Sequence, residues 1–449
     1  MLRLGPNSSS AQGPNGSSAL GPNSSSALAQ LRARLPDVAP VGAGLGLLGI
    51  SAYAFLGLAG HALAPRAYAA VASLYLLTAV VGPGVFVAVE QETSREVSSR
   101  ISTDRPTLPV LRSATVISAV LAAAVITLLL ALSPLLVHRV FGGAWSLLVA
   151  VIVAVAGSAS VHVIRGLFSG QQRYGWYGAS LAAEGLARLI PSAVLVWVGI
   201  AGTRSGTAAF GFAFALGTGL AVAATVGGVR PGAPGPPLGL PRMARGVGFL
   251  AGASALTLLL ANIAPVVLTS RLTDDPGTTA SFVSLFVLAR IPLFLFSPVQ
   301  AFLLPSLTAA VERGETARVW RQIRSVVGVT GAIGLLGVVG AAIAGPWAAR
   351  VFFNAPFELS GLVAALLGTS TVIMMIAQVL QPALVALGEH RTAMSAWIVG
   401  TVVFGALLFA PAAPLLAAVA AQLAGPAVVV VIMAVTVRAS LARKASGDG

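Results

Sequence analysis

The sequence predicts an all-α polytopic membrane protein with about twelve transmembrane helices in two pseudo-symmetric six-helix lobes. Of its 449 residues, 57% are hydrophobic and 9% are charged, whereas an average soluble domain carries about 25% charged residues. The mean hydropathy is +0.91. The hydrophobic residues form about a dozen runs of roughly 20 residues, each long enough to cross a hydrocarbon core of about 30 Å. A soluble globular enzyme is therefore excluded.

The predicted elements follow one another in two halves. Residues 1–36 are expected to form a disordered cytoplasmic tail, because repeats rich in Gly, Pro, Asn and Ser bury too little apolar surface to fold. The N-terminal lobe, 37–229, contains predicted spans at 40–62, 68–90, 110–133, 145–168, 176–199 and 206–228. After a Pro/Gly-rich cytoplasmic linker at 230–245, the C-terminal lobe, 246–437, contains spans at 246–270, 279–305, 325–347, 359–385, 392–411 and 413–437. A cytoplasmic tail covers 438–449.

The charges predict the orientation of these spans. Lys and Arg number 27 against 13 Asp and Glu, for a net charge of +14. A nucleic-acid-binding protein presents basic residues on a soluble face, but here they lie between apolar runs, so no nucleic-acid partner is expected. With both termini inside, twenty basic residues, Arg165 among them, fall on the cytoplasmic side. Five fall outside: Arg66, Arg139, Arg204, Arg271 and Arg350. The excess of Arg over Lys, with abundant Ala, Gly and Val, is typical of a high-GC bacterial genome, so the bacterial plasma membrane is the expected location.

An internal repeat relates the two halves. The fourth span of each half ends in a similar turn, Gly170–Arg173 in the first and Gly388–Arg391 in the second, 218 residues later. The second span of each half runs into a basic amphipathic stretch, at 90–105 and 307–324, expected to lie in the cytoplasm. Six spans per half make the repeats parallel, and this arrangement is one of two found in secondary transporters.

Ionisable groups inside spans are costly and mark functional sites by default. Glu184 and Arg188 lie four residues apart in the fifth span, where they can pair along one helix face. One interpretation is an internal salt bridge that locks this span against its neighbours. The other places the pair on a water-filled cavity, where a substrate or a proton competes for it.

Arg290 is the most informative position, because it lies near the middle of the eighth span with no acidic residue within a turn. A guanidinium at that depth needs an anion, and its planar fork suits phosphate oxygens. Glu184 or backbone carbonyls of another span could instead satisfy it structurally. A cavity-facing anion site is the favoured hypothesis.

Other polar residues complete the predicted substrate site. His162 in the fourth span could carry a proton near neutral pH, although an isolated buried histidine is more often a packing residue. Asn262 and Gln300, like Gln378 and Gln381, are intramembrane amides whose common role is hydrogen bonding between helices. The predicted substrate-binding set is therefore Arg290, Arg188, Glu184, His162, Gln300 and Asn262.

Several motifs are absent. There is no GxxxxGK[ST] phosphate-binding loop, no metal-ligand spacing and no cysteine. No cofactor, metal or catalytic residue is therefore predicted, and an ion or substrate gradient would supply the energy. A membrane glycosyltransferase would need a carboxylate in a well-built outer loop, but the predicted outer loops are a few residues long.

Short motifs give the chain a family resemblance. The segment 289–292 (Ala-Arg-Ile-Pro), the segment 303–307 (Leu-Leu-Pro-Ser-Leu) and the segment 312–315 (Glu-Arg-Gly-Glu) resemble span 8 and the following helix of the multidrug/oligosaccharidyl-lipid/polysaccharide (MOP) exporter superfamily. The segment 89–95 and the turn at 170–173 are similar to its polysaccharide flippase branch. The resemblance covers about residues 40–437.

This resemblance implies two six-helix lobes in a V, as in MATE transporters, around a cavity that opens alternately to each side. It also implies that the chain flips a polyprenyl-pyrophosphate-linked sugar to the outer leaflet for cell-envelope glycan synthesis. In the related lipid II flippases, an arginine at the Arg290 position lines the cavity. Those flippases also have cavity arginines in spans 1 and 2 and two further spans, which this sequence lacks, so another lipid-linked glycan is the better fit.

Two other functions remain open. The drug-exporting branch of the superfamily consists of H⁺- or Na⁺-coupled antiporters for organic cations, which need buried carboxylates, and this chain offers only Glu184 in a span interior. A non-transporting scaffold for glycan-assembly enzymes is the third. Beyond the glycan lipid, the expected partners are anionic lipids, which would contact the cytoplasmic arginines, and glycan-assembly enzymes.

Overall fold

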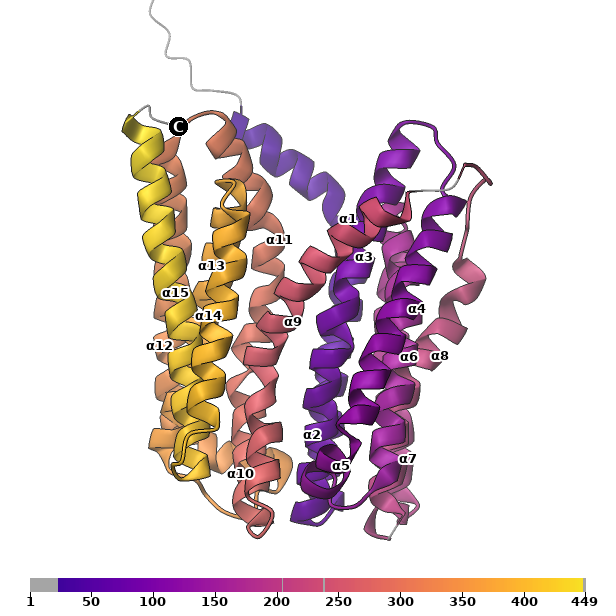
Figure 1. Ribbon diagram of the computed structural model, residues 1–449, viewed down its shortest axis with the longest axis vertical. Helices are drawn as coiled ribbons and strands as arrows, with labels where there is room; N and C mark the ends of the chain where they lie inside the picture. The colour runs from indigo at the N-terminus through magenta and orange to yellow at the C-terminus, as the bar shows by residue number, and fades with distance from the viewer. Residues whose placement is uncertain (1–22, 204, 237–238, 447–449) are drawn as a thin grey trace, which may run out of the picture.

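The computed structural model describes residues 23–203, 205–236 and 239–446, apart from the side chains of 23–38, 201, 242, 294–302, 304–305 and 445–446. In this part of the chain every regular element is a helix, and twelve helical segments are long and apolar enough to cross a membrane. The predicted all-α class and the twelve spans are confirmed. Figure 1 shows the helices in two groups, one from each half of the sequence.

The first group, here called the N lobe, contains α1 (Asn23–Ala62), α2 (Pro65–Val81), α3 (Pro83–Ser102), α4 (Leu108–Ala131), α5 (Ser133–Leu135), η1 (Leu136–Val140), α6 (Trp145–Gly170), α7 (Tyr174–Trp197), η2 (Ile200–Gly202), α8 (Gly206–Thr225) and η3 (Val226–Gly228). The second group, the C lobe, contains α9 (Leu240–Arg271), α10 (Pro276–Ala289), α11 (Ile291–Glu312), α12 (Thr316–Phe353), α13 (Gly361–Ala386), α14 (His390–Leu408) and α15 (Pro414–Ser446). Each lobe thus contributes six crossings.

The second span of each lobe is broken, although the sequence predicts a single helix for each. In the N lobe, α2 ends and α3 begins at Gly82, which Pro83 follows. In the C lobe, α10 ends and α11 begins at Arg290, and Pro292 follows two residues later. Proline lacks a backbone N–H and clashes with the preceding turn, so it interrupts a helix. The two breaks occupy equivalent places in the repeat.

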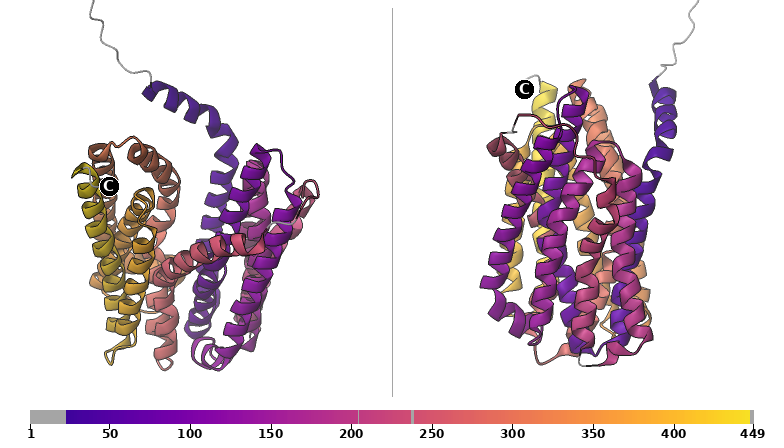
Figure 2. Two further views of the ribbon diagram at one scale, coloured as in Figure 1. Left: turned by 45° about the horizontal axis from the view of Figure 1, so that its top comes forward. Right: turned by 90° about the vertical axis from the view of Figure 1, so that its right-hand side faces the viewer.

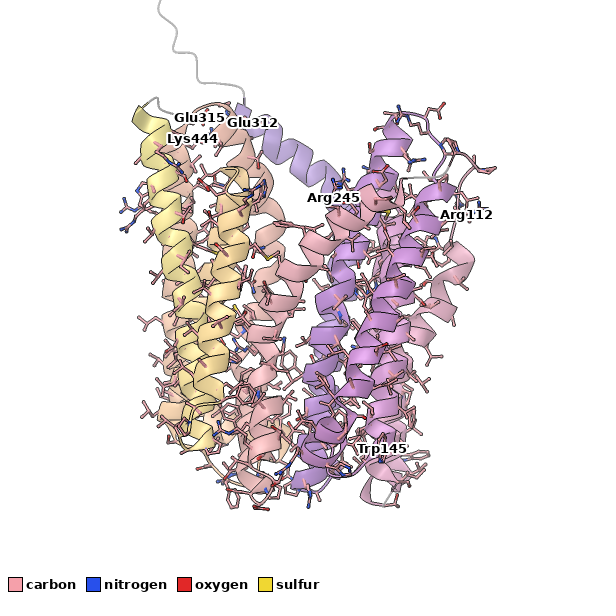
Figure 3. All side chains as sticks on the ribbon, viewed as in Figure 1. Arg112, Trp145, Arg245, Glu312, Glu315 and Lys444 are labelled. Carbon is pink, nitrogen blue, oxygen red and sulfur yellow. The ribbon has the colours of Figure 1, made fainter. Side chains whose placement is uncertain are left out.

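The chain ends of the described residues lie at one end of the bundle. Figures 1 and 2 show the start of α1 and the end of α15 there. Figure 3 places Glu312, Glu315 and Lys444 near that end and Trp145 toward the other. We call these the predicted cytoplasmic end and the predicted outer end.

Close packing between helices depends on small residues, while large apolar side chains face outward. Leu336 and Ile343 on α12 are 75% and 79% exposed, as expected for side chains that contact lipid. Between α1 and α7, a Cβ placed on Gly178 would lie 2.2 Å from the Pro40 carbonyl oxygen. Only glycine permits this approach of the two backbones.

The two lobes meet near the predicted outer end. Tyr68 on α2 and Ser284 on α10 are hydrogen bonded at 3.2 Å, and the hydroxyl groups of Ser73 and Thr269 are 3.1 Å apart. Toward the other end the ribbons of the lobes diverge, and the start of α9 crosses between them (Figures 1 and 2). These contacts join the lobes on the predicted outer side.

Three predicted tails or linkers are partly helical. Helix α1 begins at Asn23, so 23–36 is helical where a disordered tail was predicted. Apart from two serines, residues 25–34 are Ala, Leu, Gln and Arg, which are strong helix formers. Helix α9 begins at Leu240, inside the predicted linker, and α15 continues to Ser446 through the predicted C-terminal tail. Residues 1–22 lie outside the described residues.

Candidate functional site

Glu184 is buried in the N lobe between two arginines. Arg165 Nη2 on α6 donates to Glu184 Oε2 at 2.6 Å, and Arg188 Nη2, one turn along α7, donates to Oε1. The predicted Glu184–Arg188 pair is confirmed. Arg165, counted among the cytoplasmic basic residues although it falls within the predicted span 145–168, is only 4% exposed near the end of α6. Its charge is compensated within the bundle instead.

Further hydrogen bonds stabilise this ion cluster. Arg165 donates from Nε to the Ser180 hydroxyl and from Nη2 to the Ser180 carbonyl, both at 3.1 Å. Glu184 lies ten residues along α7, which is about 15 Å from its start at 1.5 Å per residue. Buried ions are tolerated at such depth when extra hydrogen bonds offset the loss of water. The geometry therefore favours the salt-bridge interpretation of Glu184.

A second carboxylate, Glu90 on α3, lies close to this cluster. Tyr177 Oη donates to Glu90 Oε1 at 2.6 Å, and His162 Nε2 lies 4.0 Å from Glu90 Oε2. The other ring nitrogen of His162 is 2.8 Å from the Ser158 carbonyl oxygen. His162 thus has a carboxylate beside it, contrary to the prediction that it is alone among apolar neighbours. Glu90, predicted to begin a cytoplasmic stretch, is instead part of the buried cluster.

Arg188 keeps one donor unused. Its guanidinium carbon lies 4.4 Å from the centre of the Phe214 ring, a cation–π contact. Gly217 makes room for the side chain, because a Cβ there would lie 2.4 Å from Arg188 Cγ. Among the described residues, none accepts a hydrogen bond from Arg188 Nε.

Arg290 lies in the C lobe at the break between α10 and α11. It is the last residue before α11, a helix of 22 residues, and its side chain is 8% exposed. The break brings the guanidinium and the N-terminus of a half-helix into the same region of the bundle. Helix N-termini carry partial positive charge and free N–H groups that favour anions.

Neutral side chains surround Arg290. Nη2 donates to Gln422 Oε1 on α15 at 2.6 Å, and Nη1 donates to Thr371 Oγ1 on α13 at 3.3 Å. The guanidinium carbon is 4.6 Å from the Phe286 ring centre. No carboxylate among the described residues pairs with Arg290, and none of them accepts from its Nε. The alternative in which Glu184 or backbone carbonyls satisfy Arg290 is not what the structure shows.

Two tyrosines lie near the arginines of the two lobes. Tyr53 on α1 is near enough to Arg290 for an electrostatic interaction, and Tyr75 on α2 is similarly placed relative to Arg188.

The predicted amides are less involved. Asn262 donates to the Leu258 carbonyl of its own helix at 3.0 Å. Gln381 accepts a hydrogen bond from Trp397 Nε1 at 3.2 Å, which is the predicted interhelical role. The side chain of Gln300 lies outside the described residues. The structure therefore does not bring Asn262 to Arg290.

Comparisons with known proteins place this geometry in a fold. No family model matches the chain. Two uncharacterized proteins of Mycobacterium tuberculosis are similar over most of it: Rv3630 is 28% identical over 401 residues (87% of this chain, 90% of the relative), and Rv1510 is 29% identical over 412 residues (88% and 90%).

Solved structures match over nearly the whole chain. An inward-facing multidrug resistance MATE family transporter of the MOP superfamily has a TM-score of 0.69 at 13% identity, covering 90% of this chain and 96% of that one. The Vibrio cholerae MATE transporter VcmN in its bent form has a TM-score of 0.60 at 13% identity, covering 94% and 99%. The chain has the MATE fold.

An outward-facing MATE family transporter is also similar, with a TM-score of 0.62 at 14% identity, covering 91% of this chain and 96% of that one.

Sequence reasoning missed several residues of the site. Gln422 and Thr371 hold Arg290, and Glu90, Arg165 and Tyr177 complete the N-lobe cluster. Gln422 is a lone amide within an apolar run, and this signal was available. The others required knowledge of where helices end and which faces meet. The described residues contain no group of three or more metal-ligating side chains.

Proposed function

We propose that this chain is an alternating-access transporter of the MOP superfamily that flips a lipid-linked glycan across the bacterial plasma membrane. The cargo is a sugar or polysaccharide precursor on a polyprenyl pyrophosphate, moved from the inner to the outer leaflet. Its phosphates are anionic at membrane depth, and its sugars cannot cross hydrocarbon unaided. Both termini would lie in the cytoplasm, as the distribution of arginines predicts.

The environment of Arg290 carries this proposal. A guanidinium buried in the C lobe has two neutral acceptors and no carboxylate among the described residues. An uncompensated buried charge is strongly unfavourable, so the site favours an anionic ligand. A phosphate would accept hydrogen bonds from Arg290 and from the N-terminus of α11.

The charges of the site in both lobes favour an anionic cargo. The five groups described above are Arg165, Arg188 and Arg290 against Glu90 and Glu184, which leaves a net charge of +1 with His162 neutral. The N-lobe charges of this set cancel, so the excess belongs to Arg290. Arg188 Nε has no acceptor among the described residues, and this donor offers a second contact for the phosphate from the opposite lobe.

Binding and release follow from the two-lobe architecture. In the inward-facing arrangement, the phosphate would reach Arg290 from the predicted cytoplasmic end, where the lobes diverge. Rocking of the lobes would then separate the contacts Tyr68–Ser284 and Ser73–Thr269 and expose the site outward. The protein forms and breaks no covalent bond in this cycle. Anionic lipids at Arg321 and Arg324 would add about 1 kcal/mol per arginine to membrane attraction.

Translocation of a labelled polyprenyl-pyrophosphate sugar in proteoliposomes tests the proposal. The wild type should flip the lipid, and Arg290→Ala should abolish flipping while the protein remains folded by circular dichroism. Arg350→Gln is the matched control, because Arg350 pairs with Glu358 at the predicted outer end of the C lobe. The absence of flipping by the wild type with every lipid-linked sugar tested would contradict the proposal.

A second candidate function rests on Glu90. This partly buried carboxylate has Tyr177 as its hydrogen-bond donor and His162 at 4.0 Å. A proton-coupled antiporter of organic cations needs such a group. Export of a cationic dye against a pH gradient, lost in Glu90→Gln and retained in Arg290→Ala, would favour this function over lipid flipping.

A further inference from the structure

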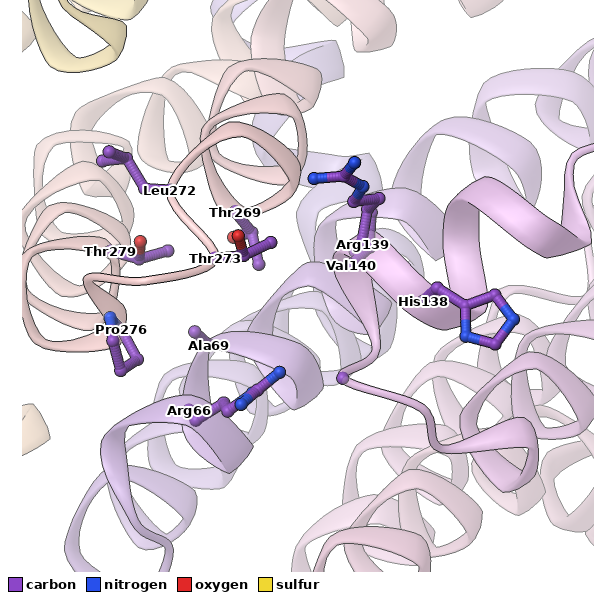
Figure 4. A pocket seen from close by; sticks show the side chains of 11 residues that line it. Arg66, Ala69, His138, Arg139, Val140, Thr269, Leu272, Thr273, Pro276 and Thr279 are labelled. Atoms are coloured by element: carbon purple, nitrogen blue, oxygen red, sulfur yellow. The ribbon is translucent and has the colours of Figure 1, made fainter.

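A pocket at the predicted outer end has walls from both lobes. Arg66 at the start of α2 and Arg139 near the end of η1 come from the N lobe, and Thr273 and Thr279 come from the loop after α9 and from α10. The pocket is small, with a volume of about 20 Å³. Figure 4 shows the two arginine side chains around it, with His138 at its edge.

The interactions of the five predicted outer arginines distinguish this pocket from the rest of the outer end. Arg271 donates to the carbonyl groups of Leu408 and Ala410, and Arg350 pairs with Glu358 at 2.7 Å. Arg204 lies outside the described residues. For Arg66 and Arg139 the described residues provide no carboxylate and no hydrogen-bond acceptor, and both arginines line the pocket.

This convergence is informative because positive charge is scarce at the outer end. Lys and Arg are depleted in outer loops, yet two of the five outer arginines come together from hairpins about 70 residues apart in sequence. Both arginines are exposed at the surface and line the same hollow. An anion with several oxygens, such as a phosphate, would accept hydrogen bonds from both.

The local backbone holds the two arginines together. Gly142 and Gly143 have φ angles of +60° and +92°, a left-handed turn that glycine adopts without strain. The turn folds the segment after η1 toward α2, so that a Cβ on Gly142 would lie 3.3 Å from Arg66 Nε. Arg66 is thereby held beside the segment that carries Arg139.

Two helix N-termini add to the positive potential. Helix α2 begins at Pro65 without a side-chain cap, so its first N–H groups remain free near Arg66. Helix α10 begins at Pro276, which lines the pocket. Two carboxylates, Asp274 and Asp275, belong to the same loop, and Asp275 accepts a hydrogen bond from the Thr278 N–H at 3.0 Å.

We propose that this pocket binds a phosphate-type anion that bridges the lobes and holds the predicted outer end closed. The pocket lies beside the interlobe contacts, because Thr269 lines the pocket and also contacts Ser73 of the other lobe. Opening outward would therefore pull the two walls of the pocket apart. The bound anion therefore stabilises the outward-closed conformation, and anions that accumulate outside slow the transport cycle. The phosphate is either free in solution or part of a lipid headgroup. The proposal does not depend on the identity of the cargo.

Spin labels on the full-length protein test this site. The chain has no cysteine, so the variant Ser205→Cys/Ala412→Cys carries labels only at the outer ends of the two lobes. In a phosphate-free maltoside detergent, inorganic pyrophosphate at millimolar concentration should bind the outward-closed state preferentially. It should therefore increase the fraction of molecules with a short distance between the two labels at least about twofold. Adding Arg66→Gln/Arg139→Gln should weaken this response at least about tenfold, and Arg350→Gln should leave it unchanged.

A second arm separates the two sources of phosphate. If a lipid headgroup is the ligand, nanodiscs of phosphatidylglycerol without pyrophosphate should already show the short distance, and Arg66→Gln/Arg139→Gln should lose it. No response of the wild type to pyrophosphate or to lipid, or an equal response in the Arg66→Gln/Arg139→Gln variant, would overturn the proposal.

Discussion

Replacing Glu184 by glutamine should destabilise the protein more than removing either of its arginine partners. The substitution preserves the size of the side chain and removes its charge. Arg165, whose Nη2 lies 2.6 Å from Glu184, and Arg188 would then both remain buried without a carboxylate. Breaking a buried ion pair from one side costs about 3–5 kcal/mol, and we expect a loss of stability in this range for Glu184→Gln.

Arg188→Gln provides the comparison. It leaves Glu184 paired with Arg165 and the pair neutral, so the loss is one hydrogen bond to a charged group, about 2 kcal/mol. Reversible unfolding in mixed micelles of increasing denaturing-detergent content measures both values. The reasoning fails if Glu184→Gln is as stable as the wild type, or if Arg188→Gln is the more destabilised of the two.

Two further substitutions test the packing and the surface. Gly178→Val should destabilise the α1–α7 contact by about 1–3 kcal/mol. Gly175→Val on the same helix should lack this effect, because a Cβ at Gly175 meets no atom within 4 Å. Thermal unfolding of both variants measures the difference. The Ser440 hydroxyl and the Arg443 guanidinium donate to Glu389 and lower the pKa of its carboxyl. At neutral pH the wild type should therefore be more stable than Glu389→Gln, by less than about 1 kcal/mol at this exposed site. The difference should vanish as the pH falls below about 4.5, the ordinary pKa of a glutamate carboxyl, toward the lower pKa of Glu389 in the folded protein. A constant difference from pH 7 to pH 3 would exclude this origin.

The architecture could be predicted because hydrophobic length and charge asymmetry are properties of the sequence alone. Twelve apolar runs give twelve spans, and the even number of spans per half gives parallel repeats. The break at Arg290 was not predicted, since the apolar run continues through it and only Pro292 hints at the interruption. That break makes Arg290 the start of a half-helix rather than a residue in mid-span.

The candidate site was only partly predictable. The Glu184–Arg188 pair follows from helical spacing, but the pairing of Arg165, which lies inside the predicted span 145–168, with Glu184 on another helix does not. Partners from other helices, such as Gln422 for Arg290, depend on which faces meet. Helical periodicity specifies the faces of one helix, whereas tertiary packing determines their neighbours.

The MATE fold itself does not determine whether the cargo is a cation or an anion, so our proposal rests on the charges of the site. A cation exporter would present an uncompensated carboxylate to its cargo. In the described part of this chain, the uncompensated group among the five charges of the site is a guanidinium, at a helix break in the C lobe. Glu90 is the residue that would reverse this conclusion if it were found to contact the cargo.

The most direct test of the central claim is a binding measurement in nanodiscs. The affinity of the wild type for a polyprenyl-pyrophosphate sugar is compared with its affinity for the uncharged polyprenol of the same length, and both measurements are repeated with Arg290→Gln. We predict that the wild type prefers the pyrophosphate at least about tenfold, the value of one charged hydrogen bond, and that Arg290→Gln abolishes the preference. An undiminished preference in Arg290→Gln, or none in the wild type, would contradict the account.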